Sequence, residues 1–182
     1  FNFVFTTIRA FETINYAVAT TLTIIKKRAI INFIFFTIAK HITNSNFLGY
    51  DAGANTTEAI NSNFLGNSAG QLADKANDSN FLGYQAGYSA NTASNSNFLG
   101  REAGYNSDFT TQSNFIGYQA GYDSDFASHS IFIGYGAGSN AYTASNSTFI
   151  GYRAGYQAPN SNNSIFIGYE EGREVINSSH SI

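Results

Sequence analysis

The chain has 182 residues, of which 43% are hydrophobic and 12% are charged, and its formal net charge is −3. This charged fraction is about half that of an average soluble domain, and the length suits one domain or one elongated repeat array. The absence of cysteine excludes disulfide frameworks, zinc–thiolate centres and thiol nucleophiles.

The charge is unevenly distributed between two parts of the chain. Residues 1–43 contain five basic side chains and one acidic side chain, whereas residues 44–182 contain four basic and eleven acidic ones. A nucleic-acid-binding surface needs a concentration of positive charge. We therefore expect no nucleic acid as a partner of residues 44–182.

Residues 1–43 form an apolar segment that contains neither glycine nor proline. Phe1, Phe3 and Phe5 alternate with other residues, as in a strand. Two apolar runs, 14–25 and 29–39, flank a basic triplet at 26–28. Neither run reaches the roughly 20 residues of a membrane-spanning helix, and the basic start at residue 26 lies too far along the chain to favour a signal peptide. The β-branched content predicts two or three strands, which would cap a neighbouring sheet or mediate assembly.

Residues 44–182 repeat with a period of 17 residues and no insertion or deletion. One phenylalanine occurs in each of eight copies, and a leucine or isoleucine follows it directly. The phenylalanines are Phe47, Phe64, Phe81, Phe98, Phe115, Phe132, Phe149 and Phe166. The residues that follow them are Leu48, Leu65, Leu82, Leu99, Ile116, Ile133, Ile150 and Ile167.

Two glycine columns keep the same register and contain sixteen of the seventeen glycines. The first column is Gly49, Gly66, Gly83, Gly100, Gly117, Gly134, Gly151 and Gly168. The second is Gly53, Gly70, Gly87, Gly104, Gly121, Gly138, Gly155 and Gly172. Because glycine adopts positive φ without a steric penalty, we interpret both columns as turn positions.

A unit of 17 residues is too short for the common helix-pair repeats, and two glycines per unit would destabilise a helix by about 1 kcal/mol each. The repeat therefore predicts an all-β fold, a parallel β-solenoid or β-roll with eight coils of 17 residues. Each coil would hold two short strands, one over Ser-Asn-Phe-Leu-Gly and one over Tyr-x-Ala-Gly-Tyr.

Stacked coils would place equivalent side chains about 4.8 Å apart. The phenylalanines would then form a core stack, and the asparagines that precede them, from Asn46 to Asn114, could form an amide ladder. Neighbouring strand residues point to opposite faces, so the leucine and isoleucine column would form an apolar stripe on the outside. We interpret this stripe as an interface with sister chains. A twisted or bulged strand that brings both columns inside is the alternative.

The motifs N-S-N-F-L-G and S-I-F-I-G, each followed by A-G, resemble the head repeats of trimeric autotransporter adhesins. Related repeats rich in G-Y-x-A-G occur in bacterial and phage tail-fibre-like proteins. The resemblance covers about residues 44–182. It implies a left-handed parallel β-roll, three chains packed side by side, and attachment to a surface.

Ten tyrosines follow the two glycine columns, six after the first and four after the second. Aromatic ladders of this kind either pack on one another or contact a ligand such as a sugar. The candidate ligand-facing tyrosines are Tyr84, Tyr88, Tyr118, Tyr122, Tyr152 and Tyr156.

No pattern of residues predicts catalysis, a cofactor or a metal site. His129 and His180 share a column but lie three coils apart, about 14 Å at strand spacing. Gly134, Gly136 and Gly138 resemble part of a phosphate loop but lack the surrounding βαβ unit. The best acid–base candidates are the carboxylate pairs Asp123 with Asp125 and Glu170 with Glu171, which we interpret as solvated turn residues.

The sequence thus predicts a structural subunit of an extracellular fibre or surface adhesin and not an enzyme. Its partners would be copies of itself, in a lateral trimer or in a head-to-tail filament in which residues 1–43 cover the open C-terminal coil of the next subunit. Surface glycans are a further expected partner, and no membrane span is expected. A phage tail-fibre shaft and a glycan- or ice-binding solenoid are the alternative functions.

Overall fold

The computed structural model describes residues 41–181, and every regular element in this part of the chain is a β-strand. The strands are β1 (His41–Thr43), β2 (Asn46–Leu48), β3 (Glu58–Ile60), β4 (Asn63–Leu65), β5 (Asn80–Leu82), β6 (Asn97–Leu99), β7 (Asn114–Ile116), β8 (Ile131–Ile133), β9 (Thr148–Ile150) and β10 (Ile165–Ile167). The sequence predicts strands and a cap for residues 1–43, of which residues 1–40 lie outside the described part.

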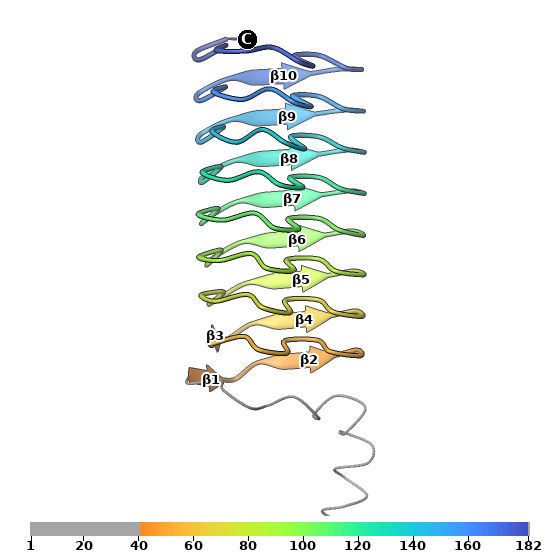
Figure 1. Cartoon of the computed structure of the whole chain (residues 1–182), viewed down its shortest axis with the longest axis vertical. Coiled ribbons are helices and arrows are strands. Elements are labelled where there is room, and N and C mark those ends of the chain that lie inside the picture. The colour runs from red at the N-terminus through yellow and green to blue at the C-terminus, as the bar shows by residue number, and fades with distance from the viewer. Residues whose placement is uncertain (1–40, 182) are drawn as a thin grey trace, which may run out of the picture. The chain divides into compact units, whose positions relative to one another are not determined.

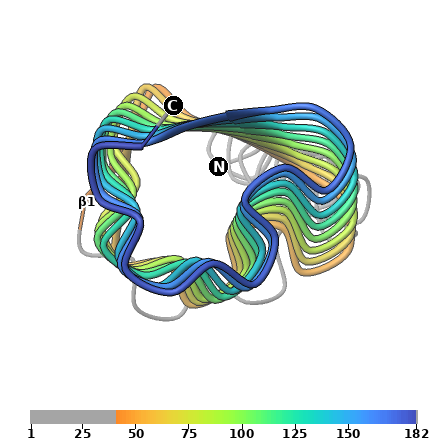
Figure 2. The ribbon, with the colours of Figure 1, turned by 90° about the horizontal axis from the view of Figure 1, so that it is seen from above.

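One eight-stranded sheet runs along the described chain in the order β10-β9-β8-β7-β6-β5-β4-β2. All neighbouring strands are parallel, and each residue pairs with the residue 17 positions further along, as Phe81 does with Phe98. Figure 1 shows the strands as successive rungs, and Figure 2 shows the turns lying over one another around a common axis. The prediction of an all-β parallel solenoid is confirmed, with about seven turns between Phe47 and Phe166.

The stacked region begins before residue 44, where the sequence places its boundary. Strand β1 pairs in parallel with β3, with Ile42 opposite Ala59. Ile42 packs against the buried core. The 17-residue register therefore already holds at His41, although residues 41–43 precede the first copy of the Ser-Asn-Phe motif at residues 45–47.

The prediction of a second strand over Tyr-x-Ala-Gly-Tyr is wrong. In the coil that contains Tyr84–Tyr88, this stretch forms turns. Gln85, Gly87 and Ser89 have φ values of 53°, 63° and 55°. Three left-handed residues within five positions bend the chain too sharply for an extended strand. The β-propensity of tyrosine is overridden because the coil has to close within 17 residues.

The phenylalanine column fills the interior of the solenoid. The eight rings stack in one line, with centroids of neighbouring rings 4.7–4.9 Å apart. The six rings from Phe64 to Phe149 are fully buried. Burying a phenylalanine side chain stabilises a fold by about 1.5–3 kcal/mol, so this stack is the main apolar contribution of each coil.

Serine and alanine columns complete the interior and close each coil. The hydroxyl of Ser79 donates to the carbonyl of Ala93, 14 residues later, at 2.8 Å and accepts the N–H of Ser96 in the next coil at 3.1 Å. The equivalent serines repeat this pattern along the stack. Among the described residues, no buried side-chain nitrogen or oxygen lacks a hydrogen-bond partner. This pairing offsets the cost of removing the polar column from water.

Glycine is required in the two columns for different physical reasons. At Gly100, φ is 135°, and an added Cβ would lie 2.4 Å from the carbonyl oxygen of Gly117 in the next coil. At Gly104, φ is 62°, and an added Cβ would lie 2.3 Å from the Phe98 ring. The first column therefore permits close contact between neighbouring backbones, and the second makes room for the phenylalanine of its own coil.

Candidate interaction surface

The residues before and after each phenylalanine in β2 and β4–β10 point out of the solenoid and form what we call the outer sheet face. In every one of these strands the flanking residues are more exposed than the central phenylalanine. Leu82 is 36% exposed and Ile116 is 38% exposed. The alternative in which both apolar columns lie inside is therefore wrong, because the strands keep a regular alternation.

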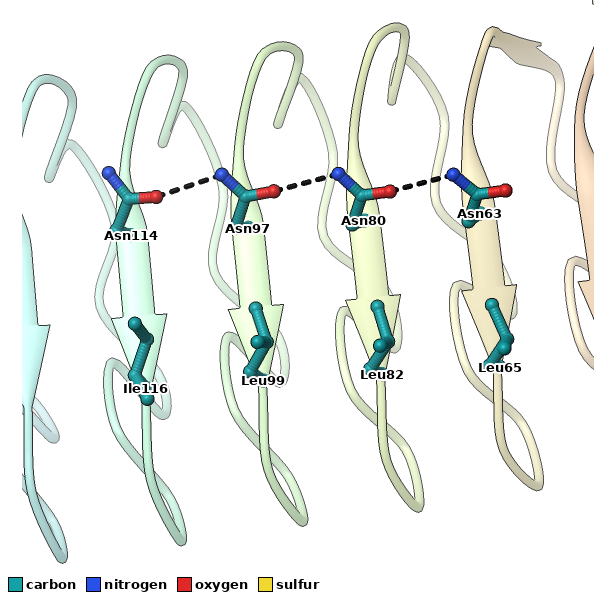
Figure 3. Close-up of a pocket in the computed structure, with 8 residues that line it drawn as sticks. All are labelled: Asn63, Leu65, Asn80, Leu82, Asn97, Leu99, Asn114 and Ile116. Carbon is teal, nitrogen blue, oxygen red and sulfur yellow. Dashed lines mark hydrogen bonds between the residues drawn. The ribbon is translucent and has the colours of Figure 1, made fainter.

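An asparagine ladder runs along the first half of the outer sheet face. The side-chain amide of Asn63 donates to the amide oxygen of Asn80 at 2.8 Å, Asn80 donates to Asn97 at 2.8 Å, and Asn97 donates to Asn114 at 2.9 Å. Figure 3 shows these amides in one row beside the row formed by Leu65, Leu82, Leu99 and Ile116. Each bond follows the solenoid axis, so the ladder ties neighbouring coils together and leaves one amide N–H of each asparagine for other partners.

The outer sheet face becomes more apolar towards β10. The asparagine column continues as Ile131, Thr148 and Ile165 in β8, β9 and β10. Ile131 and Ile165 are 39% and 41% exposed, and both flank buried phenylalanines. From β8 onward the face therefore presents only aliphatic side chains and one threonine.

No charged residue occurs in either column of the outer sheet face. Most charges of the described part lie on the turns, for example at Arg101, Glu102, Arg153 and Glu170, and Glu58 lies in β3, which belongs to the separate β1–β3 sheet. An open groove of about 530 Å³ extends over β4–β7 between the asparagine and leucine rows. A continuous uncharged face with exposed apolar side chains is the surface property expected of a contact region.

Seven of the described tyrosines pack on one another in two columns. The first is Tyr118, Tyr135, Tyr152 and Tyr169, with ring centroids 4.8, 5.2 and 5.1 Å apart. The second is Tyr88, Tyr105 and Tyr122, with both spacings 5.0 Å. Each inner ring has a neighbouring ring on both faces. These inner rings therefore present ring edges and hydroxyl groups outward rather than free faces on which a sugar could stack.

Arginine side chains extend these aromatic columns. Arg101 lies between Tyr84 and Tyr118, with its guanidinium 5.3 Å and 5.7 Å from the two ring centroids. Arg153 lies 5.2 Å from the Tyr152 centroid and 5.3 Å from that of Tyr156. These distances are within the range of cation–π attraction. All six candidate ligand-facing tyrosines thus have a stacked ring or a guanidinium against them.

Two exposed phenylalanines were missed at the sequence level. Phe109 and Phe126 stack with centroids 5.0 Å apart and are 48% and 51% exposed. Their φ values are 51° and 50°, which is uncommon for a large residue. Both residues occupy a turn column that elsewhere contains Thr92 and Asn160. Because phenylalanine does not recur throughout this column, the repeat pattern does not single out these two residues.

The carboxylate pairs considered as acid–base candidates lie in turns, where Asp125 accepts a hydrogen bond and Glu170 forms an ion pair. The N–H of Asp108 donates to the Asp125 carboxylate at 3.0 Å. Burial raises the pKa of Asp125, and the charges of Asp108 and Asp123 raise it further, against the lowering effect of that hydrogen bond. Glu170 is paired with Arg173 at 2.8 Å, whereas Glu171 is exposed.

The remaining sequence candidates lie apart from one another. His41, His129 and His180 are exposed in separate coils, and within residues 41–181 no three metal-ligating side chains cluster. Gly134 approaches the backbone of Gly151, and Gly138 faces Phe132. Two of the three glycines of the phosphate-loop motif are therefore required for the packing of the coils. The described chain also contains no helix long and apolar enough to cross a membrane.

No protein-family model, curated protein or solved structure matches this chain. The outer sheet face is therefore characterised by its own geometry: a charge-free, repetitive surface on a stack of parallel β-coils.

Proposed function

We propose that this chain is a structural subunit of an extracellular fibre or surface adhesin that associates with copies of itself through the outer sheet face. The observation that carries the proposal is the leucine and isoleucine column, which is partly or fully exposed in all eight strands of the sheet and contains no charge. The coils beneath it supply stiffness, because backbone and side-chain hydrogen bonds connect each coil to the next.

The outer sheet faces of two identical copies match each other in spacing. Their side chains recur at the same spacing of about 4.8 Å, so contacts made in one coil can be repeated in all the others. The face carries no charge, so like copies do not repel one another there. A lateral trimer would cover more of the stripe than a dimer, because each chain would contact two neighbours. A tail-fibre shaft, the alternative within this class, would use the same stacked coils and the same contacts between chains.

A regular external surface, such as ice or a glycan, is the second candidate partner of the outer sheet face. The asparagine ladder supports it, because the ladder presents one free amide N–H per coil at constant spacing. This alternative needs an uncovered face, whereas self-association covers the face.

Self-association is tested by placing charge on the outer sheet face. The double variant Leu82→Glu/Ile116→Glu adds two carboxylates that association would bury without partners, which is unfavourable by several kcal/mol. We expect the wild-type chain to form trimers or longer assemblies in sedimentation velocity, and the variant to need at least about tenfold higher concentration, equivalent to about 1.4 kcal/mol.

The matched control is Gln112→Glu/Asn146→Glu, which adds the same charge two coils apart on an exposed turn column. This control should assemble like the wild type. A wild-type chain that stays monomeric at all concentrations, or a Leu82→Glu/Ile116→Glu variant that assembles normally, would contradict the proposal. Monomers that bind ice or a glycan array through the same face would favour the second candidate.

A further inference from the structure

Tyrosine is the main oxidisable side chain of this protein. The sequence contains twelve tyrosines but no cysteine, methionine or tryptophan. Thiols and thioethers, the usual targets of oxidation, are therefore absent. One-electron oxidants that reach the chain will act chiefly on phenols.

The fold places seven of these phenols in direct ring-to-ring contact. The column from Tyr118 to Tyr169 contains three stacked pairs, and the column from Tyr88 to Tyr122 contains two. Tyr135, Tyr152 and Tyr169 are 46%, 38% and 76% exposed. An oxidant can reach these rings, and their outer edges have room to move.

We propose that the two stacked tyrosine columns are sites of dityrosine cross-linking between neighbouring coils, driven by a peroxidase with hydrogen peroxide or by another one-electron oxidant. Each of two phenols loses one electron and one proton to give a tyrosyl radical. The radicals couple through the ring carbons next to their hydroxyl groups, and the hydrogens on those carbons move to the oxygens to restore both phenols. Overall, two electrons and two protons leave the pair, and one hydrogen peroxide takes up both electrons and both protons to become two waters.

Proximity makes the reaction intramolecular. Ring centroids in each pair lie 4.8–5.2 Å apart, so a radical meets its neighbour before it meets another molecule in dilute solution. Coupling requires the rings to swing from face-to-face stacking to contact through their edges, and the exposure of Tyr152 and Tyr169 permits this movement. Each cross-link would join residues 17 positions apart and covalently fasten two coils.

The test compares two triple variants that retain the same number of tyrosines. Tyr105→Phe/Tyr135→Phe/Tyr169→Phe leaves no stacked tyrosine pair among the described residues, because the remaining tyrosines of each column lie two coils apart. Tyr50→Phe/Tyr84→Phe/Tyr142→Phe removes three tyrosines that stack on no other tyrosine ring in the described chain and keeps all five pairs. Phenylalanine preserves ring packing in both variants, and equal urea midpoints would verify that both fold.

Each full-length protein is oxidised at low concentration with horseradish peroxidase and hydrogen peroxide, and the monomer band is analysed for dityrosine fluorescence and by peptide mapping. We expect the second variant to match the wild type, with cross-links between residues 17 apart, and the first variant to yield roughly tenfold less intrachain dityrosine. Equal yields in the two variants, or dityrosine found only in dimers, would overturn the proposal. The readout uses monomers, so it does not depend on the self-association proposed above.

Discussion

Replacing Gly138 with alanine is expected to destabilise the fold by about 3 kcal/mol, because the new methyl group overpacks the core and stays in a left-handed conformation. An added Cβ would lie 2.3 Å from the Phe132 ring, and φ at Gly138 is 64°. The Phe132 ring cannot retreat, since it stacks on Phe115 and Phe149 at 4.7 and 4.8 Å. Urea denaturation followed by circular dichroism measures the loss.

Gly136→Ala is the matched control, two residues away in the same coil. Gly136 has almost the same φ, 63°, but an added Cβ would meet nothing closer than the Arg153 side chain at 3.5 Å. The equivalent residues of neighbouring coils are Gln119 and Arg153, with φ values of 52° and 53°. We expect a change within about 1 kcal/mol, because the left-handed cost is partly offset by the lower entropy of the unfolded chain. Equal losses in the two variants would show that φ, not the phenylalanine, determines the second glycine column.

Replacing Phe98 with alanine is expected to destabilise the fold by about 3–5 kcal/mol, the usual range for removing a buried aromatic ring. Phe98 is fully buried and stacks on Phe81 and Phe115 at 4.8 and 4.9 Å. Its loss would open a cavity in the middle of the stack, which the hydrogen-bonded coils on either side cannot close. The free energy of unfolding from urea titration checks the value.

The adjacent residue provides the control, because Leu99 lies on the outer sheet face and is only partly buried. Leu99→Ala should lower the stability of the monomer by less than about 1 kcal/mol. Stability losses of similar size at Phe98 and Leu99 would contradict the inside–outside assignment of the two columns. The measurement is made at low protein concentration, where association does not contribute.

The sequence was sufficient to predict the parallel stack, because the same side chains return every 17 residues without an insertion. A phenylalanine such as Phe81 can only pair with its equivalents in a structure that advances by one strand spacing per unit. The alternation of Asn80, Phe81 and Leu82 also predicts which side chains are inside. Period and alternation are local in sequence, so they can be read without coordinates.

Three features could not be read in this way. The Tyr84–Tyr88 stretch has strand-forming residues but makes turns, because closure of the coil imposes left-handed φ at Gln85 and Ser89. The exposed pair Phe109 and Phe126 occupies a turn column of mixed composition. The strand β1 lies before the first copy of the repeat motif in the sequence. In each case the stacking of neighbouring coils, rather than the local sequence, decides the conformation.

The central claim is that successive 17-residue units advance along one axis by one strand spacing. The chain has no cysteine, so spin labels can be attached specifically to pairs of introduced cysteines. These cysteines would replace residues of the exposed turn column that contains Asn61, His129 and Asn163. For labels at Asn61 and His129, four units apart, we predict a separation of about 19 Å, and for Asn61 and Asn163, six units apart, about 29 Å. Electron paramagnetic resonance distances that rise in this linear way would support the account. A separation that does not grow with the number of units would contradict it.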